Sequence, residues 1–511
     1  MDYLRKVIDE AKGSDDEAEP AGRTAEPQPE RVLLDQYNDV KIYRERGEPL
    51  GLYEIPAPRY RGEERDLIRA IFELATNSLP PEAMLATQAE KRERYRHKVL
   101  EIIESTRELN VPLNAKEFYA NAVVREMAGF GMLDPLITDD NLEEIMVIGT
   151  GRPVYVFHRK HQMLRTNVVF YDDKDVTDLI DRIARNVGRR IDSQSPLLDA
   201  RLPDGTRVNA TMQPISLNGS TITIRKFKGD ALSIVDLVLN HTLTPRAAAF
   251  LWLTTDGMGA LPANVIIAGG TASGKTTTLN ALTGFVPKYE RIISIEDTAE
   301  LQLPFTHWVR FEARPPGVEG TGEIDTDTLL KNALRMRPDR IIVGEIRGAE
   351  GKTLFTAMNT GHHGAMGTIH SNNSRETLVR LLNEPIGVPE IMIPALNFVV
   401  MQQRTYDRRK GLIRRVTEIA EIIPREDGQL PDTNVIFQWD AANDELVDLG
   451  TPVHYVQMLA RYTGQSKEDL LAELEEREKI LAKLAAGNVR SLGQVCKAVQ
   501  EHALAKKAGK F

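Results

Sequence analysis

The feature that most constrains this chain is a glycine-rich motif at residues 269–276, which reads Gly-Gly-Thr-Ala-Ser-Gly-Lys-Thr and matches G-x-x-x-x-G-K-[ST] in full. The apolar run NVIIA precedes the motif and the helix-prone run TTTLNAL follows it. Glycines let backbone N–H groups turn toward a polyphosphate at a helix N-terminus, where unpaired donors and the helix dipole favour anions. The motif therefore predicts a strand, a phosphate-binding loop and a helix of a nucleotide-binding α/β domain.

Two side chains of the motif have a predicted chemical role. Lys275 supplies a point charge to the β- and γ-phosphates, and the hydroxyl of Thr276 is a ligand for Mg²⁺, which keeps several waters and few protein ligands. A chance match in a glycine-rich turn is disfavoured because both neighbouring elements are of the right type. We expect ATP and Mg²⁺ as cofactors, bound by Gly269, Gly270, Thr271, Ala272, Ser273, Gly274, Lys275, Thr276 and Thr277.

Composition places the chain among soluble, folded proteins. Its 511 residues predict three or four domains at roughly 100 to 200 residues each. Hydrophobic residues at 41% and charged residues at 27% exclude collagen-like, low-complexity and wholly disordered chains. The single cysteine, Cys496, excludes an internal disulfide and a cysteine-based zinc site, so a reducing compartment is expected.

Localisation and partners follow from hydropathy and charge. No run approaches the roughly 18 apolar residues of a membrane span, and the first residues lack the apolar core of a signal peptide, so we expect a cytoplasmic protein. The net charge of −9 gives no global attraction to nucleic acid or anionic lipid. We therefore expect no direct contact with nucleic acid.

The pattern along the chain predicts four segments. Residues 1–30 carry nine acidic and four basic side chains and few apolar ones, so they are predicted to be a disordered acidic tail. Short extended pieces and then two runs of helical spacing indicate a helical N-terminal subdomain over 31–110. Hairpins and a helix indicate an α+β domain over 111–230, and alternating strands and helices indicate the ATP-binding domain over 231–511. A flexible linker is expected near 229–238.

Polar side chains follow three further predicted strands of the last segment. The strand RIISI ends at Glu296, which Asp297 and Glu300 follow; the strand RIIVG ends at Glu345; and the strand AMGTI ends at His370. A hydrolase needs a metal anchor, a group that positions water and a sensor of the γ-phosphate, and ligands bind at the carboxyl ends of parallel strands. Alone, each group has an ordinary structural reading as a helix cap or a satisfied histidine.

Taken together, four ordered motifs resemble a known superfamily. GGTASGKT, IEDTAEL, RMRPDRIIVGEIRG and TGHHGAMGTIHSNN look like the Walker A motif, Asp box, Walker B motif and His box of the secretion ATPases that power type II secretion, type IV pili, the archaeal flagellum and type IV export. The resemblance covers about residues 115 to 425. It implies a RecA-like P-loop ATPase C-terminal domain, a separate α+β (PAS-like) N-terminal domain and a helical N-terminal extension.

The same resemblance implies catalytic roles, position by position. Glu300 polarises the attacking water with support from Glu296 and Asp297, and Glu345 holds Mg²⁺ through water. His370 senses the γ-phosphate or contacts a neighbouring domain. Two arginines of the N-terminal domain, which reach the triphosphate as charge stabilisers, would be Arg207 in GTRVNA and Arg225 in TITIRKF. Without the family, an arginine on a strand is as well explained as a surface residue or an ion-pair partner.

One departure separates the chain from bacterial type II members, which carry a paired CxxC zinc subdomain that a single cysteine rules out. The stretches YEIPAP and RRIDSQSPLLDARLPDG look instead like the archaeal branch. The resemblance implies a homohexameric cytoplasmic motor, peripheral at the membrane, that drives pilin-like filaments or exported proteins through a polytopic platform protein. Two alternatives stay open: a conjugation-type nucleoprotein export ATPase, and a scaffold regulated by nucleotide without turnover.

Overall fold

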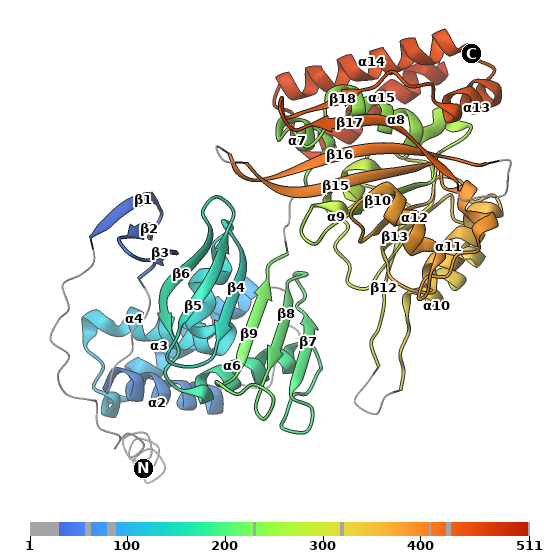
Figure 1. Cartoon of the computed structure of the whole chain (residues 1–511). Helices are drawn as coiled ribbons and strands as arrows, with labels where there is room; N and C mark the ends of the chain where they lie inside the picture. Colours follow the sequence, from blue (N-terminus) through green and yellow to red (C-terminus); the bar gives the residue numbers. More distant parts are fainter. Residues whose placement is uncertain are drawn as a thin grey trace. The chain divides into compact units, whose positions relative to one another are not determined.

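The computed structural model describes residues 30–56, 63–78, 88–227, 231–316, 321–407, 410–425 and 431–508. The chain divides into two compact units, 1–228 and 229–511, which are described separately (Figure 1). The predicted acidic tail lies almost entirely outside the described residues. Among the described helices, none has both the length and the apolar character that crossing a bilayer requires.

A nine-stranded sheet forms the centre of the N-terminal unit, in the order β1-β2-β3-β6-β5-β4-β9-β8-β7. All pairs are antiparallel except β3 with β6. The strands are β1 (Arg31–Tyr37), β2 (Val40–Glu45), β3 (Gly51–Glu54), β4 (Leu142–Ile148), β5 (Pro153–His158), β6 (Gln162–Val169), β7 (Leu197–Arg201), β8 (Arg207–Thr211) and β9 (Thr221–Arg225).

Helices of this unit form two groups. The helices α2 (Glu63–Ser78), α3 (Gln88–Ser105) and α4 (Lys116–Ala128) pack on one another around a small apolar cluster of their own. The short α5 (Asp134–Thr138) and the amphipathic α6 (Asp173–Asn186) belong to the sheet, because Val176, Leu179 and Ile183 of α6 join its core. Asp172 caps α6 by accepting a hydrogen bond from the backbone N–H of Lys174.

Strands β1 to β3 occupy the short extended pieces expected at the start of the segment 31–110, but they do not stand apart from the next domain. Leu52 of β3 pairs in parallel with Arg165 of β6, so this segment extends the sheet of the following domain. Tyr37 and Tyr53 donate hydrogen bonds to Asp139 Oδ2, at 2.7 and 2.5 Å, and tie the added strands to the rest. The pairing of β3 with β6 joins residues more than 100 positions apart and leaves no local pattern in the sequence. The alternation of apolar residues in a strand indicates which face is buried, but it does not indicate which strand is the partner.

The C-terminal unit is built on a second nine-stranded sheet, in the order β12-β11-β13-β14-β10-β15-β16-β17-β18. Pairing is parallel from β12 to β15 and antiparallel from β15 to β18. The strands are β10 (Val265–Gly269), β11 (Ile292–Glu296), β12 (Trp308–Glu312), β13 (Arg340–Ile346), β14 (Met366–Ile369), β15 (Phe398–Asp407), β16 (Gly411–Ile423), β17 (Asp432–Asp440) and β18 (Glu445–Asp448).

Helices cover both faces of this sheet (Figure 1). Val265 and Ile267 of β10 join the core on one face, whereas Ile266 and Ala268 join the core on the other, as strand geometry requires. The first core includes α7 (Ile234–Leu239), α8 (Pro245–Asp256), α9 (Lys275–Thr283), α13 (His454–Thr463), α14 (Lys467–Ala486) and α15 (Leu492–Ala508). The second includes α10 (Thr326–Ala333), α11 (Glu350–Asn359) and α12 (Ser374–Leu382). The mixed α/β class is confirmed.

The flexible linker expected near 229–238 is wrong for most of its length. Residues from Ile234 form helix α7, which a reciprocal capping box between Ser233 and Asp236 begins. Ile234, Val235 and Leu237 are buried in the core, and Asp236 Oδ1 lies 2.6 Å from Arg490 Nε in the connection between α14 and α15. Burial and a cap therefore fix a segment that, being short and next to a predicted boundary, suggested a hinge.

Candidate active site

The phosphate-binding loop connects β10 to α9 with two residues in the left-handed backbone region. Gly274 has φ +98° and Ala272 has φ +57°. Gly274 is the N-cap of α9 and has no side chain to satisfy the first N–H groups of the helix, so these donors remain available to an anion. A Cβ added at Gly270 would meet no atom within 4 Å, so the loop is open at that point. This geometry fits a bound polyphosphate.

A chain of hydrogen bonds and ion pairs joins the ends of the four motifs. Lys275 Nζ donates to Gly270 O at 2.9 Å and lies 3.3 Å from His370 Nδ1. His370 Nε2 lies 3.1 Å from Glu345 Oε1, and Arg347 Nε lies 2.8 Å from the same oxygen. Arg347 Nη1 is 3.7 Å from Asp297 Oδ2. Lysine, histidine, glutamate, arginine and aspartate thus alternate across the carboxyl edge of the sheet.

The charges of this chain set its protonation. Burial and the charge of Lys275 hold the pKa of His370 below its ordinary value, although Glu345 opposes them. Burial also lowers the pKa of Lys275. For Glu345, burial raises the pKa, but the hydrogen bond and charge of Arg347 outweigh it, and the pKa lies below its ordinary value. Because an ammonium only donates, Nδ1 of a neutral His370 accepts from Lys275, which leaves the ring proton on Nε2, the nitrogen that faces Glu345 Oε1.

A break in strand pairing positions Glu345. The β13–β14 register shifts between Val343 and Ile346, and Thr368 Oγ1 donates to Gly344 O at 2.7 Å inside that interval. Bulges of this kind bend a strand and re-aim a side chain, and they occur next to active sites. The irregularity explains why the acid of this strand is two residues beyond the last regular pair.

Glu296 organises the loop that carries Glu300. Its side chain is 2% exposed, and Oε2 accepts hydrogen bonds from the backbone N–H groups of Glu300 at 2.7 Å and Leu301 at 2.9 Å. A Cβ added at Gly344 would lie 2.9 Å from Glu296 Cγ, so glycine there leaves room for this carboxylate. Glu296 therefore fixes the backbone of the loop at the residue that carries the Glu300 side chain.

The remaining predicted residues lie in two places. Glu300 is half-buried within the loop that follows β11, and Thr276 is the second residue of α9. Thr276 and Glu345 offer a hydroxyl and a carboxylate, the oxygen donors that Mg²⁺ prefers, so these residues fit the ion. Arg207 and Arg225 lie in the N-terminal unit, directly opposite each other on β8 and β9, and the Arg225 side chain is 57% exposed.

Two residues beside the phosphate loop were not identified from the sequence. Gln402 ends the regular part of β15, and Arg414 lies on β16, and both contact the loop. The residue spacing gives no signal for them, because their position depends on β15 pairing with β10. Arg347, by contrast, is visible in the sequence two residues after Glu345.

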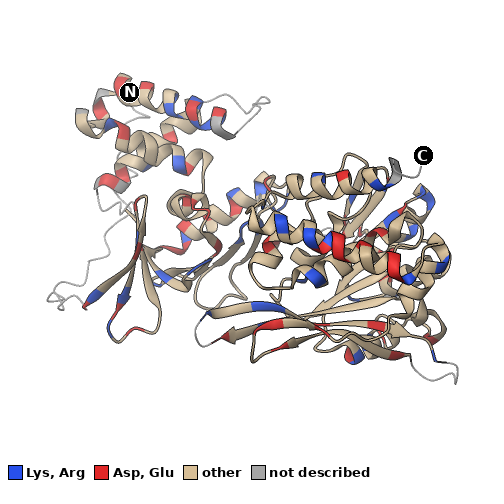
Figure 2. Ribbon diagram, turned by 90° about the horizontal axis from the view of Figure 1, so that it is seen from above, with Lys and Arg blue, Asp and Glu red and all other residues tan. Residues whose placement is uncertain are grey.

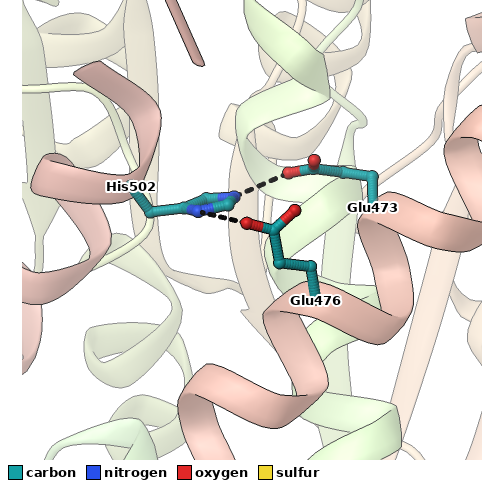
Figure 3. A group of neighbouring side chains, drawn as sticks. All are labelled: Glu473, Glu476 and His502. Carbon is teal, nitrogen blue, oxygen red and sulfur yellow. Dashed lines mark hydrogen bonds and ion pairs between the residues drawn. The ribbon is translucent and has the colours of Figure 1, made fainter. Parts of the chain in front are cut away.

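A further group of side chains with metal-ligand chemistry, found among the described residues, lies away from the loop. Glu473 and Glu476 on α14 flank the His502 ring on α15, with the carboxylates at opposite ring nitrogens (Figure 3). Lys506 Nζ lies 3.0 and 2.6 Å from the two carboxylates, and Arg477 Nε lies 2.8 Å from Glu473. Protein cations already occupy these oxygens, so the group is an ion-pair network that joins two helices.

Burial of Glu296 predicts a pH dependence of stability. Burial raises its pKa to about 7, although its two backbone N–H donors oppose the rise. A raised folded-state pKa gives stability that is complete below the unfolded value near 4.5 and is lost as the pH rises through about 7. Glu296→Gln stays neutral, so in nucleotide-free protein its melting temperature relative to wild type should rise between pH 5 and pH 8. An equal difference at both pH values, as expected for the exposed control Glu390→Gln, would contradict this.

Comparison with known proteins agrees with these motifs. The family model described as "Type II/IV secretion system protein" matches residues 126–420. An uncharacterized protein of Methanocaldococcus jannaschii is 33% identical over 71% of this chain and 74% of its own length. The conjugal transfer protein TrbB of Rhizobium radiobacter is 30% identical over 56% of this chain and 85% of its own length.

Among solved structures, the crystal structure of the VirB11 ATPase from the Brucella suis type IV secretion system is similar at 25% identity, with a TM-score of 0.29, covering 56% of this chain and 95% of that one. The family assignment rests on the family model, which matches more than half of the chain, and on the Methanocaldococcus relative. The resemblance read from the four motifs is thereby confirmed: the chain belongs to the type II/IV secretion system protein family.

Proposed function

We propose that this protein is a motor ATPase that hydrolyses ATP to ADP and phosphate to drive assembly or secretion through a membrane-embedded platform protein. The observation that carries the proposal is the chain of hydrogen bonds and ion pairs from Lys275 through His370 and Glu345 to Arg347 and Asp297. It brings a phosphate-binding cation, a sensor and acidic groups to one sheet edge. These are the parts that phosphoryl transfer to water requires.

The residues of the site have distinct tasks in this proposal. The N–H groups at the start of α9 and Lys275 bind the phosphates, and Glu300, which Glu296 holds in place, orients and polarises the attacking water. Thr276 and Glu345 would hold Mg²⁺, which neutralises charge that develops on the phosphate oxygens. His370, between the lysine and Glu345, is placed to register whether a γ-phosphate is bound.

The larger architecture is part of the same proposal. We infer a RecA-like ATPase domain and a PAS-like N-terminal domain in a cytoplasmic homohexamer at the inner face of the membrane, with the machine of an archaeal-type pilus, flagellum or exporter as its setting. Arg207 and Arg225 act as charge stabilisers when the two domains of the ring close. Their direct pairing across β8 and β9 supports this, because it places two guanidinium groups side by side.

A conjugation-type nucleoprotein exporter is the alternative that a specific observation favours, since TrbB is named as a conjugal transfer protein. Against direct nucleic-acid contact stands the distribution of charge, because acidic and basic segments are interspersed over both units (Figure 2). The net charge of −9 also opposes it. A scaffold without turnover is disfavoured by the intact set of acidic groups at the sheet edge.

Lys275→Ala tests the assignment of the site. Loss of the ammonium removes charge that stabilises the transferring phosphoryl group, so turnover should fall by about 10² or more. The measurement is phosphate release from ATP by purified protein, with circular dichroism to check the fold. The control Lys352→Ala removes an exposed lysine of α11 and should keep wild-type turnover. Wild-type turnover in Lys275→Ala would refute this loop as the active site.

Glu300→Gln and Glu296→Gln separate the two acidic roles. Glu300→Gln keeps its size but loses the charge that positions water, so nucleotide affinity should be kept and turnover reduced by about 10² to 10⁴. Glu296→Gln can still accept the backbone hydrogen bonds and should lose less turnover. Equilibrium nucleotide binding and steady-state turnover decide between them. The reverse order would show that the catalytic acid is Glu296.

Arg207→Ala tests the role of the N-terminal unit. An arginine that arrives on closure stabilises the transition state more than bound ATP, so kcat should fall by about 10² to 10³ while nucleotide affinity changes little. Sedimentation with a non-hydrolysable analogue should show the same oligomeric state for this variant as for the wild type. The matched control is Arg185→Ala, an exposed arginine on α6 of the same unit. Unchanged kinetics in Arg207→Ala would contradict this role and would show that Arg207 is an ordinary surface residue.

A further inference from the structure

The hairpin of β15 and β16 lies against the outer side of the phosphate loop. Gly269, the last residue of β10, pairs in register with Gln402 of β15. A Cβ added at Gly269 would collide with the Gln402 backbone oxygen, and one at Gly274 would lie 2.9 Å from Gln402 Nε2. The Gln402 backbone therefore accounts for the need for glycine at position 269, and its side chain also lies close to Gly274.

Arg414 holds the same loop from β16. Its Nε donates a hydrogen bond to Ala272 O at 3.0 Å, and a Cβ added at Gly274 would lie 3.4 Å from its Cδ. The C=O of Ala272 and the N–H of Ser273 belong to one trans peptide unit, so they point in opposite directions. Because Arg414 holds the carbonyl on the outside, the Ser273 N–H faces the inside of the loop, where it reaches Gly270 O at 3.4 Å.

Ala272 needs such a restraint. Its φ of +57° is in the left-handed region, which a residue with a Cβ occupies only when its surroundings hold it there. Gln402 is a second restraint with spare hydrogen-bonding capacity: its side chain is 1% exposed, and its Oε1 is buried without a hydrogen-bond partner among the described residues. Both groups reach the loop from one hairpin.

We propose that Arg414 and Gln402 are positioning residues of the ATP site, which fix the outer side of the phosphate loop so that its N–H groups face the phosphates. They act through the loop and not on the reacting atoms. The inference rests on the proposed ATPase function.

The test is steady-state turnover and titration of a fluorescent ATP analogue with the full chain, for wild type, Arg414→Ala, Arg414→Lys and Gln402→Met. A preorganised loop binds ground state and transition state equally, so Arg414→Ala should raise KM and Kd by about 3- to 10-fold, the loss of one hydrogen bond, with kcat kept within about twofold. Arg414→Lys keeps the positive charge but loses the fixed direction of the Nε–H group, so its KM and Kd should remain above the wild-type values. Gln402→Met keeps its volume and should also raise KM.

Each result bears on the proposal. An Arg414→Ala variant with wild-type KM and Kd, or one that loses kcat alone, overturns it. Full recovery in Arg414→Lys also overturns it, because charge on the phosphates would then be the cause. The control Arg461→Ala, an exposed arginine on α13, should match wild type in all constants. Failure of the wild type itself to bind or hydrolyse ATP would instead refute the proposed function.

Discussion

Parallel hydrogen bonding between β13, β14 and β10 is the constraint on which the site depends. Parallel strands end at the same edge, so the residues after Ile369, Gly269 and Val343 meet, although about 100 residues of chain separate Gly269 from Ile369. The edge is then refined locally. The interruption of the β13 register turns Glu345 toward His370, and the left-handed Gly274 begins α9 beneath the loop. The meeting of these polar strand ends is thus set by strand order before any side chain is considered.

Local pattern was sufficient to predict elements whose signal lies within a few residues. The strand before Gly269, the helix that starts at Lys275 and the polar strand ends at Glu296, Glu345 and His370 are where spacing placed them. Local pattern was insufficient where a contact joins distant segments. Parallel pairing of β3 with β6, the burial of α7 in the expected linker and the approach of β16 to the loop are of this kind.

The glycines of the site also show the difference between features that a local pattern predicts and features that depend on distant segments. Sequence reasoning attributes the glycines of the loop to backbone freedom, which holds for Gly274 with φ +98°. The other reason for glycine is space: Gly269 and Gly274 face Gln402, and Gly344 faces Glu296. These neighbours are supplied by strands that are not adjacent in sequence. A motif can therefore record a packing requirement without indicating which residue imposes it.

Positive and negative charges balance in the chain of side chains at the carboxyl edge of the sheet. This balance explains how one arrangement suits both the polyphosphate and the divalent cation of the proposed reaction. Lys275 and Arg347 carry two positive charges, Glu345 and Asp297 carry two negative ones, and the lowered pKa of His370 keeps it neutral between them. A bound polyphosphate can replace Gly270 O and His370 as the partner of Lys275, while a divalent cation can bind at Glu345. Because both exchanges pass through His370, occupancy of one half of the network changes the hydrogen bonds of the other. In the proposed ATPase, the histidine would therefore link phosphate binding to the position of Glu345.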